Sequence, residues 1–239
     1  MVAPPPSVVS VDLDAHWNFT IPAQRWPEIA NRCHFMAGVA RYDERYGNFR
    51  VRLACRGYLS WSRSITPPAS ISIFMEPGMA FGTGTHETTQ LCLESLERDF
   101  VPGTTCLDVG TGSGILAIAA VKLGARRVVA CDIDPIAVTI AAQNGAQNDC
   151  GVKIRWIQGD VEQVRRFQPG CIVANLTVEL IEQEFWKFEQ RLKQGALLIV
   201  SGVLNRQAIR VERLRQQSSL RLRRRLKKGE WTCLVYDRP

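Results

Sequence analysis

The chain lacks the sequence features that define several classes of protein. Its eight cysteines never form a C-x-x-C pair, which argues against zinc knuckles. No apolar run approaches the roughly 18 residues that a bilayer-spanning helix needs. The amino terminus, M-V-A-P-P-P-S, has neither the basic segment nor the apolar core of a secretory signal. We therefore expect a soluble cytoplasmic protein with reduced core cysteines, no membrane contact and no metal site.

What is present is an ordinary globular composition with an uneven distribution of charge. The 239 residues are 46% hydrophobic and 22% charged, which suits one large domain or one domain with a small companion. The net charge is +7, but residues 206–228 hold ten basic side chains against one acid, Glu212. This basic tract alone is +9 and leaves −2 for the rest of the chain. It indicates either a solvated face or a nucleic-acid contact.

The segment P-P-A-S at 67–70 divides the chain into two regions. In residues 1–66 we expect strands at 8–12 and 48–55 and a helix at 23–36. From residue 104 onward, short β-branched runs alternate with stretches of helical period, as in βαβ units. The expected strands are 104–109, 127–132, 152–158, 171–175 and 196–201, and the expected helices are 113–123, 135–148, 178–192 and 205–216. The end of the chain, 219–227 and 230–237, is expected to form an antiparallel pair. This order predicts an α/β fold with a doubly wound, mostly parallel sheet and one reversed strand.

A glycine-rich turn joins the first of these strands to its helix. Asp108-Val-Gly110-Thr-Gly112-Ser-Gly114 places glycines where the backbone must approach a ligand, next to a helix start with free N–H groups. The spacing G-x-G-x-G differs from the pyrophosphate-binding G-x-G-x-x-G. Asp108 would repel a diphosphate held close to it. A cationic or zwitterionic ligand fits this turn better.

An acidic residue ends the second strand, 22 residues beyond Gly110. Asp132 occupies the position from which a carboxylate accepts both ribose hydroxyls in nucleoside-binding sheets. Asp134 precedes Pro135 and is better placed to cap the next helix. The turn and Asp132 together predict a ligand that contains adenosine.

Two more polar residues follow strands three and four. Ligands of open α/β sheets lie outside the carboxyl ends of the strands, so these residues should line the same pocket. Asp160 could accept a hydrogen bond from an adenine amino group or could cap the short helix that follows. Asn175 ends the fourth strand, where a substrate would meet the cofactor, and its amide needs a partner if it is buried.

The segment that precedes the first of these strands is rich in glycine and threonine. It reads E-P-G-M-A-F-G-T-G-T-H-E-T-T and enters a helix near Thr88, as expected for a loop that folds over a ligand. Thr89 could donate a hydrogen bond to a carboxylate. His86 is one of only three histidines and has no partnered aspartate in the sequence, so a hydrogen bond that fixes the loop is favoured over general-base catalysis.

These segments, in this order, resemble the PrmA family. The resemblance rests on the threonine-glycine loop, on L-D-V-G-T-G-S-G-I-L-A-I-A-A-V-K-L-G-A, on D-I-D-P-I-A-V, on V-A-N-L and on the closing G-E-W, over residues 73–236. The family comprises S-adenosylmethionine-dependent enzymes that methylate amino groups, lysine side chains and an amino terminus, of the eleventh protein of the large ribosomal subunit. The resemblance implies that Thr89, Gly110, Asp132 and Asn175 bind the cofactor.

The resemblance also implies a fold and a division of roles. We expect a seven-stranded Rossmann-like class I methyltransferase domain at 67–239, and at 1–66 a small region that is a candidate for a reduced substrate-recognition domain. Methyl transfer needs positioning more than covalent chemistry. Asp108 and the Gly110–Gly112 turn would hold the methionine end, and Asn175 would orient the uncharged amine by accepting an N–H. If the basic tract is a nucleic-acid contact and not a solvated face, we expect it to dock against ribosomal RNA beside the acceptor protein, with an affinity that falls steeply with salt.

Other functions remain open at this point. The acceptor could be another protein or a nucleic acid, although Leu-Thr-Val after Asn175 lacks the prolines and the aromatic ring of amino-methylating DNA enzymes. The chain could also be a noncatalytic, ribosome-associated module that has kept only its cofactor affinity.

Overall fold

The computed structural model describes residues 71–75, 86–164 and 167–239 with their side chains, and the backbone of four short strands that precede them. These are β1 (Val8–Asp12), β2 (Asn18–Pro22), β3 (Tyr42–Tyr46) and β4 (Phe49–Leu53). β1 lies where it was predicted and β4 falls within the predicted 48–55, whereas β2 and β3 were not predicted. The helix predicted at 23–36 lies outside the described residues.

A further strand, β5 (Ile71–Met75), was missed because the prolines before it suggested only a chain break. It pairs with β4 in parallel, so the three-stranded sheet β3-β4-β5 takes strands from both sides of the boundary expected near residue 67. Ile73 and Met75 are fully buried in the core of the larger domain. Asn148 fixes β5 there, because its side chain exchanges hydrogen bonds with the backbone N–H and C=O of Phe74.

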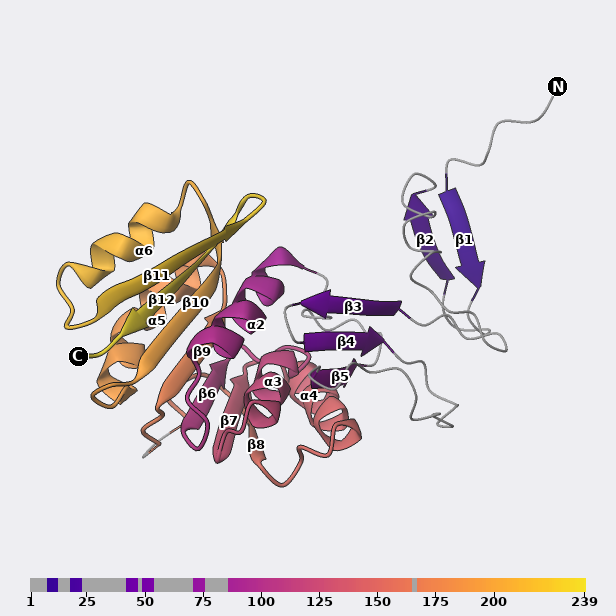
Figure 1. Ribbon diagram of the computed structural model, residues 1–239, viewed down its shortest axis with the longest axis horizontal. Helices are drawn as coiled ribbons and strands as arrows, with labels where there is room; N and C mark the ends of the chain where they lie inside the picture. Colours follow the sequence, from indigo (N-terminus) through magenta and orange to yellow (C-terminus); the bar gives the residue numbers. More distant parts are fainter. Residues whose placement is uncertain are drawn as a thin grey trace.

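The central sheet confirms the predicted topology (Figure 1). Its spatial order is β11-β12-β10-β9-β6-β7-β8. The strands are β6 (Thr105–Val109), β7 (Arg127–Asp132), β8 (Ile154–Gln158), β9 (Cys171–Asn175), β10 (Leu197–Leu204), β11 (Arg221–Lys228) and β12 (Trp231–Asp237). β12 runs antiparallel to both neighbours and all other pairs are parallel. The fold is therefore a doubly wound, mostly parallel seven-stranded sheet with one reversed strand.

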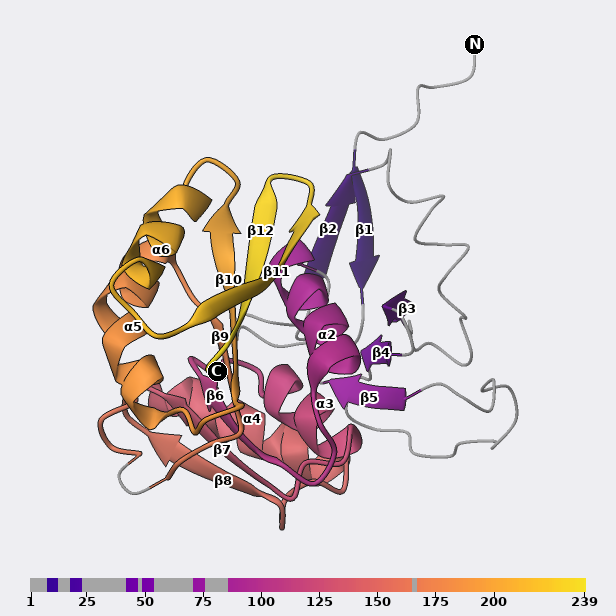
Figure 2. The same cartoon turned by 60° about the vertical axis from the view of Figure 1, so that its left-hand side comes forward.

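Helices cover both faces of this sheet (Figure 1 and Figure 2). One face carries α2 (Glu87–Asp99), α3 (Ile115–Lys122) and α4 (Pro135–Gln147), and the other carries α5 (Val178–Arg191) and α6 (Ala208–Arg215). Helix α6 is shorter than the predicted 205–216, since it starts at Ala208 and ends at Arg215. Ala208 and Val211, three residues apart on one helical face, make its buried contacts, whereas Ile209 is 51% exposed.

The strands are nearly continuous apolar runs because the sheet is buried on both faces. Alternate residues face opposite layers: Cys106 packs with α2 and α3, whereas Leu107 and Val109 pack with α5. The described cysteines are all buried with free thiols, as predicted: Cys92, Cys106, Cys131, Cys150, Cys171 and Cys233. Among the described residues, no helix is both long and apolar enough to cross a membrane.

The chain reverses its winding direction at β6, which lies between β7 and β9. At such a switch point the loops after neighbouring strands separate and leave a crevice at the carboxyl edge of the sheet. The segments that follow β6, β7, β8 and β9 all meet at this edge. The residues predicted to bind a ligand lie on these segments or on the adjoining start of α2.

Candidate functional site

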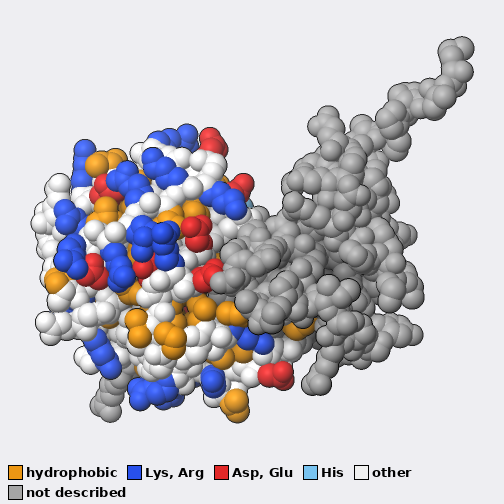
Figure 3. Space-filling view, in the orientation of Figure 1, with side chains coloured by type: hydrophobic (Ala, Val, Ile, Leu, Met, Phe, Trp, Pro, Cys, Tyr) orange, Lys and Arg blue, Asp and Glu red, His pale blue; other side chains and the backbone are white. Residues whose placement is uncertain are grey.

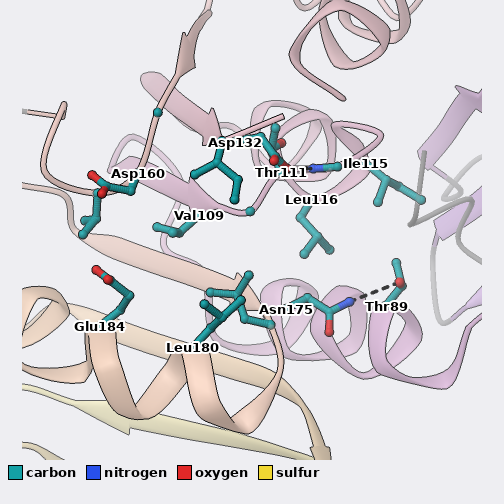
Figure 4. A pocket seen from close by; sticks show the side chains of 16 residues that line it. Thr89, Val109, Thr111, Ile115, Leu116, Asp132, Asp160, Asn175, Leu180 and Glu184 are labelled. Carbon is teal, nitrogen blue, oxygen red and sulfur yellow. Dashed lines mark hydrogen bonds between the residues drawn. The ribbon is translucent and has the colours of Figure 1, made fainter. Parts of the chain in front are cut away.

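A pocket of about 280 Å³ opens at the carboxyl edge of the sheet (Figure 4). Its walls come from the ends of the central strands and from α2, α3 and α5. Six of the seven predicted site residues line it, namely Thr89, Gly110, Gly112, Asp132, Asp160 and Asn175. The seventh, Asp108, lies outside the lining. The structure therefore brings together residues that are up to 86 positions apart in the chain.

The charges around the pocket have one sign. Asp132, Asp160 and Glu184 supply three carboxylates, and no lysine or arginine is present among the described residues that line it. Opposite charges attract more strongly at a partly buried site than in bulk water. The pocket is therefore suited to a cationic ligand and unsuited to a diphosphate.

The glycine turn forms the floor of the pocket next to Leu176. Gly110 has a positive φ of 70°, and a Cβ at this position would lie 2.4 Å from Cδ2 of Leu176. The positive φ thus disfavours a side chain at this position, and Leu176 would have to move to admit one. The turn and the segment after β9 pack against each other as a result.

Asp108 holds the turn from behind. Its side chain is fully buried, and Oδ2 accepts hydrogen bonds from the Thr111 hydroxyl at 2.7 Å and from the Ala117 N–H at 3.0 Å. Oδ1 has no hydrogen-bond partner among the described residues. Burial raises the pKa of Asp108 to about 7, although these two hydrogen bonds act in the opposite direction. Asp108 therefore shapes the turn and the start of α3, and does not form part of the pocket wall.

Asp132 is fixed at the end of β7 by backbone donors. Its Oδ2 accepts the Gly112 N–H at 2.9 Å, and its Oδ1 accepts the Asp134 N–H at 3.0 Å. Asp134 caps α4 by accepting the Ile136 N–H at 2.8 Å, as predicted. The carboxylate of Asp132 therefore has one orientation beside the glycine turn.

Asp160 and Glu184 lie on opposite walls at one end of the pocket (Figure 4). Oδ1 of Asp160 accepts the Glu162 N–H at 2.6 Å. Asp160 therefore makes a capping contact and also lines the pocket. Oε1 of Glu184 receives Lys187, whereas its Oε2 is buried without a hydrogen-bond partner in the described part of the chain.

Two further pocket-lining residues, Glu184 and its neighbour Leu180, were not predicted from the sequence. The two lie one turn apart on α5, beside the buried stripe that contains Ile181 and Phe185. The available signal was the position of α5, because the first helix after β9 must begin at the carboxyl edge. Lys187 also pairs with Glu162 at 2.9 Å, which connects α5 to the segment after β8.

The amide of Asn175 has the partners that its partial burial requires. Its Nδ2 donates to the hydroxyl oxygens of Thr88, at 3.1 Å, and Thr89, at 3.4 Å (Figure 4). Since the Thr88 oxygen accepts from Asn175, its hydroxyl proton is directed to Nδ1 of His86, 2.8 Å away. His86 caps α2, and its ring lies edge-on to Trp231 with centroids 5.0 Å apart. The histidine thus fixes the start of α2, in the role predicted for it.

A β-bulge in β10 completes the support of Asn175. The register with β12 shifts between Val200 and Val203, and Gly202 adopts a φ of 87°. A Cβ on Gly202 would lie 2.1 Å from the carbonyl oxygen of Leu176. The adjacent Ser201 accepts the Leu176 N–H through its carbonyl and donates its hydroxyl to the Thr88 carbonyl. The bulge therefore binds the segment after β9 and the start of α2 together.

The sequence of this chain is similar to those of known proteins. The family model described as ribosomal protein L11 methyltransferase (PrmA) matches residues 52–239. The chain is 40% identical over 176 residues to the ribosomal protein L11 methyltransferase of Pelotomaculum thermopropionicum and 44% identical over 179 residues to that of Geobacter sulfurreducens. Each match covers 74% of this chain but only 57% and 58% of the relatives, so the chain spans little more than half of their length.

A solved structure agrees with these matches. The ribosomal protein L11 methylase of Lactobacillus delbrueckii subsp. bulgaricus superposes with a TM-score of 0.70 at 31% identity. The superposition covers 79% of this chain and 94% of that one. The family model also spans the glycine turn and all the pocket-lining residues. The chain belongs to the PrmA family.

Proposed function

We propose that the protein transfers a methyl group from S-adenosylmethionine to an amino group of a ribosomal protein. The observation that carries this proposal is the convergence of the glycine turn, Asp132 and Asn175 on one pocket at the switch point of the sheet. The proposal also agrees with membership of the PrmA family.

The residues present fit this cofactor. When bound, S-adenosylmethionine supplies a methyl group on a positively charged sulfur, and the three carboxylates of the pocket, without a lysine or arginine in its described lining, suit that charge. Asp132 is held in position to accept hydrogen bonds from a ribose. Asp160 and the unpartnered Oε2 of Glu184 are acceptors suited to an adenine amino group.

Thr89 and Asn175 would act at the methionine and acceptor ends. The Thr89 oxygen accepts from Asn175, so its hydroxyl proton remains available for a carboxylate. The Asn175 nitrogen is used on the two threonines, so its carbonyl oxygen is the atom left to accept an N–H from an incoming amine. That contact would turn the lone pair of an uncharged amine toward the methyl group, and such positioning lowers the barrier without covalent catalysis.

The acceptor follows from the family. The relatives named above are ribosomal protein L11 methyltransferases, so we propose an amino group of L11, a lysine side chain or the amino terminus, as the methylated site. We propose residues 1–66 as the region that recognises the acceptor, with 67–239 as the catalytic domain. A cytoplasmic location, where ribosomes are found, goes with this proposal.

The test uses the full chain, methyl-labelled S-adenosylmethionine and purified L11. Intact-mass analysis should show L11 heavier by one or more methyl groups. Asp132→Ala should abolish the labelling, whereas Asp134→Asn, which keeps an acceptor at the cap of α4, should retain it.

Other outcomes would reject the proposal. Label that enters added ribosomal RNA and is lost with nuclease would identify a nucleic-acid methyltransferase. Cofactor binding by calorimetry without transfer to either acceptor would indicate a noncatalytic module.

A further inference from the structure

A second hollow lies at the opposite edge of the sheet. This amino-edge groove, of about 800 Å³, is bordered by the amino ends of β6, β7 and β8 and by the segments that lead into β9 and β10. Four cationic side chains line it: Arg126, Arg127, Lys153 and Lys193. The described lining contains no aspartate or glutamate. The groove is therefore a concentrated positive site on a domain whose opposite edge is acidic.

The backbone holds these cations in place. The Arg126 N–H donates to the Thr104 carbonyl at 2.8 Å, and the Lys153 carbonyl accepts the Val128 N–H at 2.9 Å. Lys193 is part of the turn before β10, where its carbonyl accepts the Ala196 N–H at 3.1 Å. These hydrogen bonds fix the points from which the side chains extend, so the cations stay grouped although the side chains are exposed.

None of the four cations forms an ion pair with another residue of the described chain. Lysine and arginine side chains line the lower margin of the domain in Figure 3, the side on which Figure 1 places the start of β8. Like charges brought together in this way repel one another unless an anion lies between them. The described chain therefore supplies no acidic residue to neutralise the four cations of the groove.

The basic tract at 206–228 is different, because much of its charge is satisfied internally. Arg210 pairs with Glu179 and Glu182 on α5. Along β11 the pairs are Arg221 with Asp237, Arg223 and Arg224 with Asp99, and Arg225 with Glu212. At least half of the ten cations thus already have an acidic partner. The tract, which is more basic in sequence, is less available to an external anion than the groove.

We propose that the amino-edge groove binds the phosphodiester backbone of RNA. A single-stranded nucleic acid can place several phosphates along one open groove, and grooves of this kind combine cations with apolar surface for bases. Val152 is 99% exposed and Phe167 is partly buried at the groove, and Thr105 and Gln168 add neutral polar groups. An acidic peptide would use the cations but gain less from the apolar surface.

The groove goes beyond the proposed methyl transfer. It lies at the amino edge and the pocket at the carboxyl edge, so the bound RNA would be a docking partner and not the methyl acceptor. RNA binding therefore stands or fails independently of the identity of the acceptor protein.

The test measures binding of a short fluorescein-labelled oligouridine to the full chain by fluorescence anisotropy between about 50 and about 200 mM salt. Four phosphate contacts to a single strand predict a slope of log K against log salt of about −3. Charge reversal at Arg127, Lys153 and Lys193 together should lower the affinity at least about tenfold and bring the slope close to −1.

The matched control reverses three cations of the basic tract that have no ion pair in the described structure, Arg206, Arg213 and Lys227. The change in net charge is the same, yet the affinity should fall less than about threefold. Thermal unfolding and cofactor affinity report whether each variant is folded. If the groove variant does not fold, the single change Lys193→Gln should still reduce the magnitude of the slope by about 0.7.

Three results would overturn the proposal. The first is an equal loss of affinity in the two triple variants, since that reflects net charge alone. The second is an unmodified chain that does not bind the oligouridine at about 50 mM salt. The third is displacement of the RNA by polyglutamate at equal charge concentration, which would identify an acidic protein as the partner, or by inorganic phosphate, which would identify a small-anion site.

Discussion

The two edges of the central sheet bear opposite charge. β7 begins with Arg127 in the amino-edge groove and ends with Asp132 in the pocket. β6 likewise reaches from Thr105 at the groove to Val109 at the pocket. The pocket has three carboxylates and no cation in its described lining, whereas the groove has four cations and no carboxylate in its own. A parallel sheet aligns all its strand starts at one edge and all its strand ends at the other, so each edge can carry its own chemistry.

The two sites also differ in how their polar groups are held. In the pocket, Asp132 and Asn175 are fixed by two hydrogen bonds each. In the groove, the cationic side chains are exposed and without ion pairs in the described chain. Fixed, partly buried groups resist screening by salt, whereas exposed charges are screened. Raising the salt concentration should therefore weaken RNA binding while leaving cofactor binding nearly unchanged.

The largest predicted effect comes from a substitution on the pocket side of the sheet. Gly202→Ala places a Cβ against the Leu176 carbonyl and adds strain at a positive φ, so we expect a loss of about 4 kcal/mol or more in unfolding free energy. Gly195→Ala is the control, since its φ is also positive but nothing lies within 4 Å of the added Cβ, and it should cost only about 1 kcal/mol. Urea denaturation measures both. Equal costs would show that the contact with Leu176 is unimportant.

A second prediction uses pH to distinguish the pocket edge of the sheet from the groove edge. With a pKa of about 7 in the folded state against 3.8 ordinarily, Asp108 favours folding at low pH, and this contribution is lost as the pH rises through 7. It should amount to about 3 kcal/mol between about pH 5 and about pH 8. Asp108→Asn should remove this dependence, and Asp134→Asn should keep it. Stability curves of the same shape in wild type and Asp108→Asn would refute the assignment. RNA binding should not follow this titration, because Asp108 is not part of the groove.

The third prediction tests the two ends of one strand against each other. Asp132→Ala should weaken binding of S-adenosylmethionine about 100-fold, because charged hydrogen bonds contribute roughly 1.5 to 3 kcal/mol each. Arg127→Ala should leave that affinity intact and weaken oligouridine binding about threefold. On both variants, calorimetry measures the affinity for S-adenosylmethionine and fluorescence anisotropy measures the affinity for oligouridine. If either substitution impaired both ligands to a similar extent, the independence of the two edges would have to be abandoned.

A smaller loss of cofactor affinity is predicted for Glu184 than for Asp132. Replacing the carboxylate, whose Oε2 is unpartnered, by the amide in Glu184→Gln should weaken cofactor binding about fivefold to tenfold through loss of one acceptor. Glu162→Gln removes the other partner of Lys187 but does not touch the pocket, and a surface ion pair contributes little, so its effect should stay below about twofold. An unchanged affinity in Glu184→Gln would leave Asp160 as the only candidate for the adenine amino group.

The pocket was largely predictable because its chemistry is local. A glycine turn, an acid at the end of the next strand and an asparagine at the end of the fourth strand each follow from their own short segment. Sheet topology then brings six of the seven predicted residues to one place. Asp108 is the exception. Its adjacency to the turn suggested a ligand contact, but it alternates with pocket-side Val109 along β6 and therefore points away from the pocket.

The groove and the bulge were not predictable, because each depends on residues that lie far apart in the sequence. Arg127, Lys153 and Lys193 are separated by whole βα units, and only the alignment of strand starts makes them neighbours. Gly202 interrupts an otherwise ordinary apolar strand, and its need for space arises from Leu176, 26 residues earlier. The sequence also overstates the free positive charge of the basic tract. Its acidic partners, such as Asp99 and Glu179, are distant in sequence and become neighbours only in the fold.

The arginines of β11 have a consequence that does not involve RNA or the ribosome. β11 is the last strand at its end of the sheet, so its outer backbone groups could pair with a strand of another molecule. Its exposed residues, Arg221, Arg223, Arg225 and Lys227, disfavour such pairing, because charged side chains protect an edge strand. The positive charge that stands out in the sequence thus protects the protein against edge-to-edge aggregation.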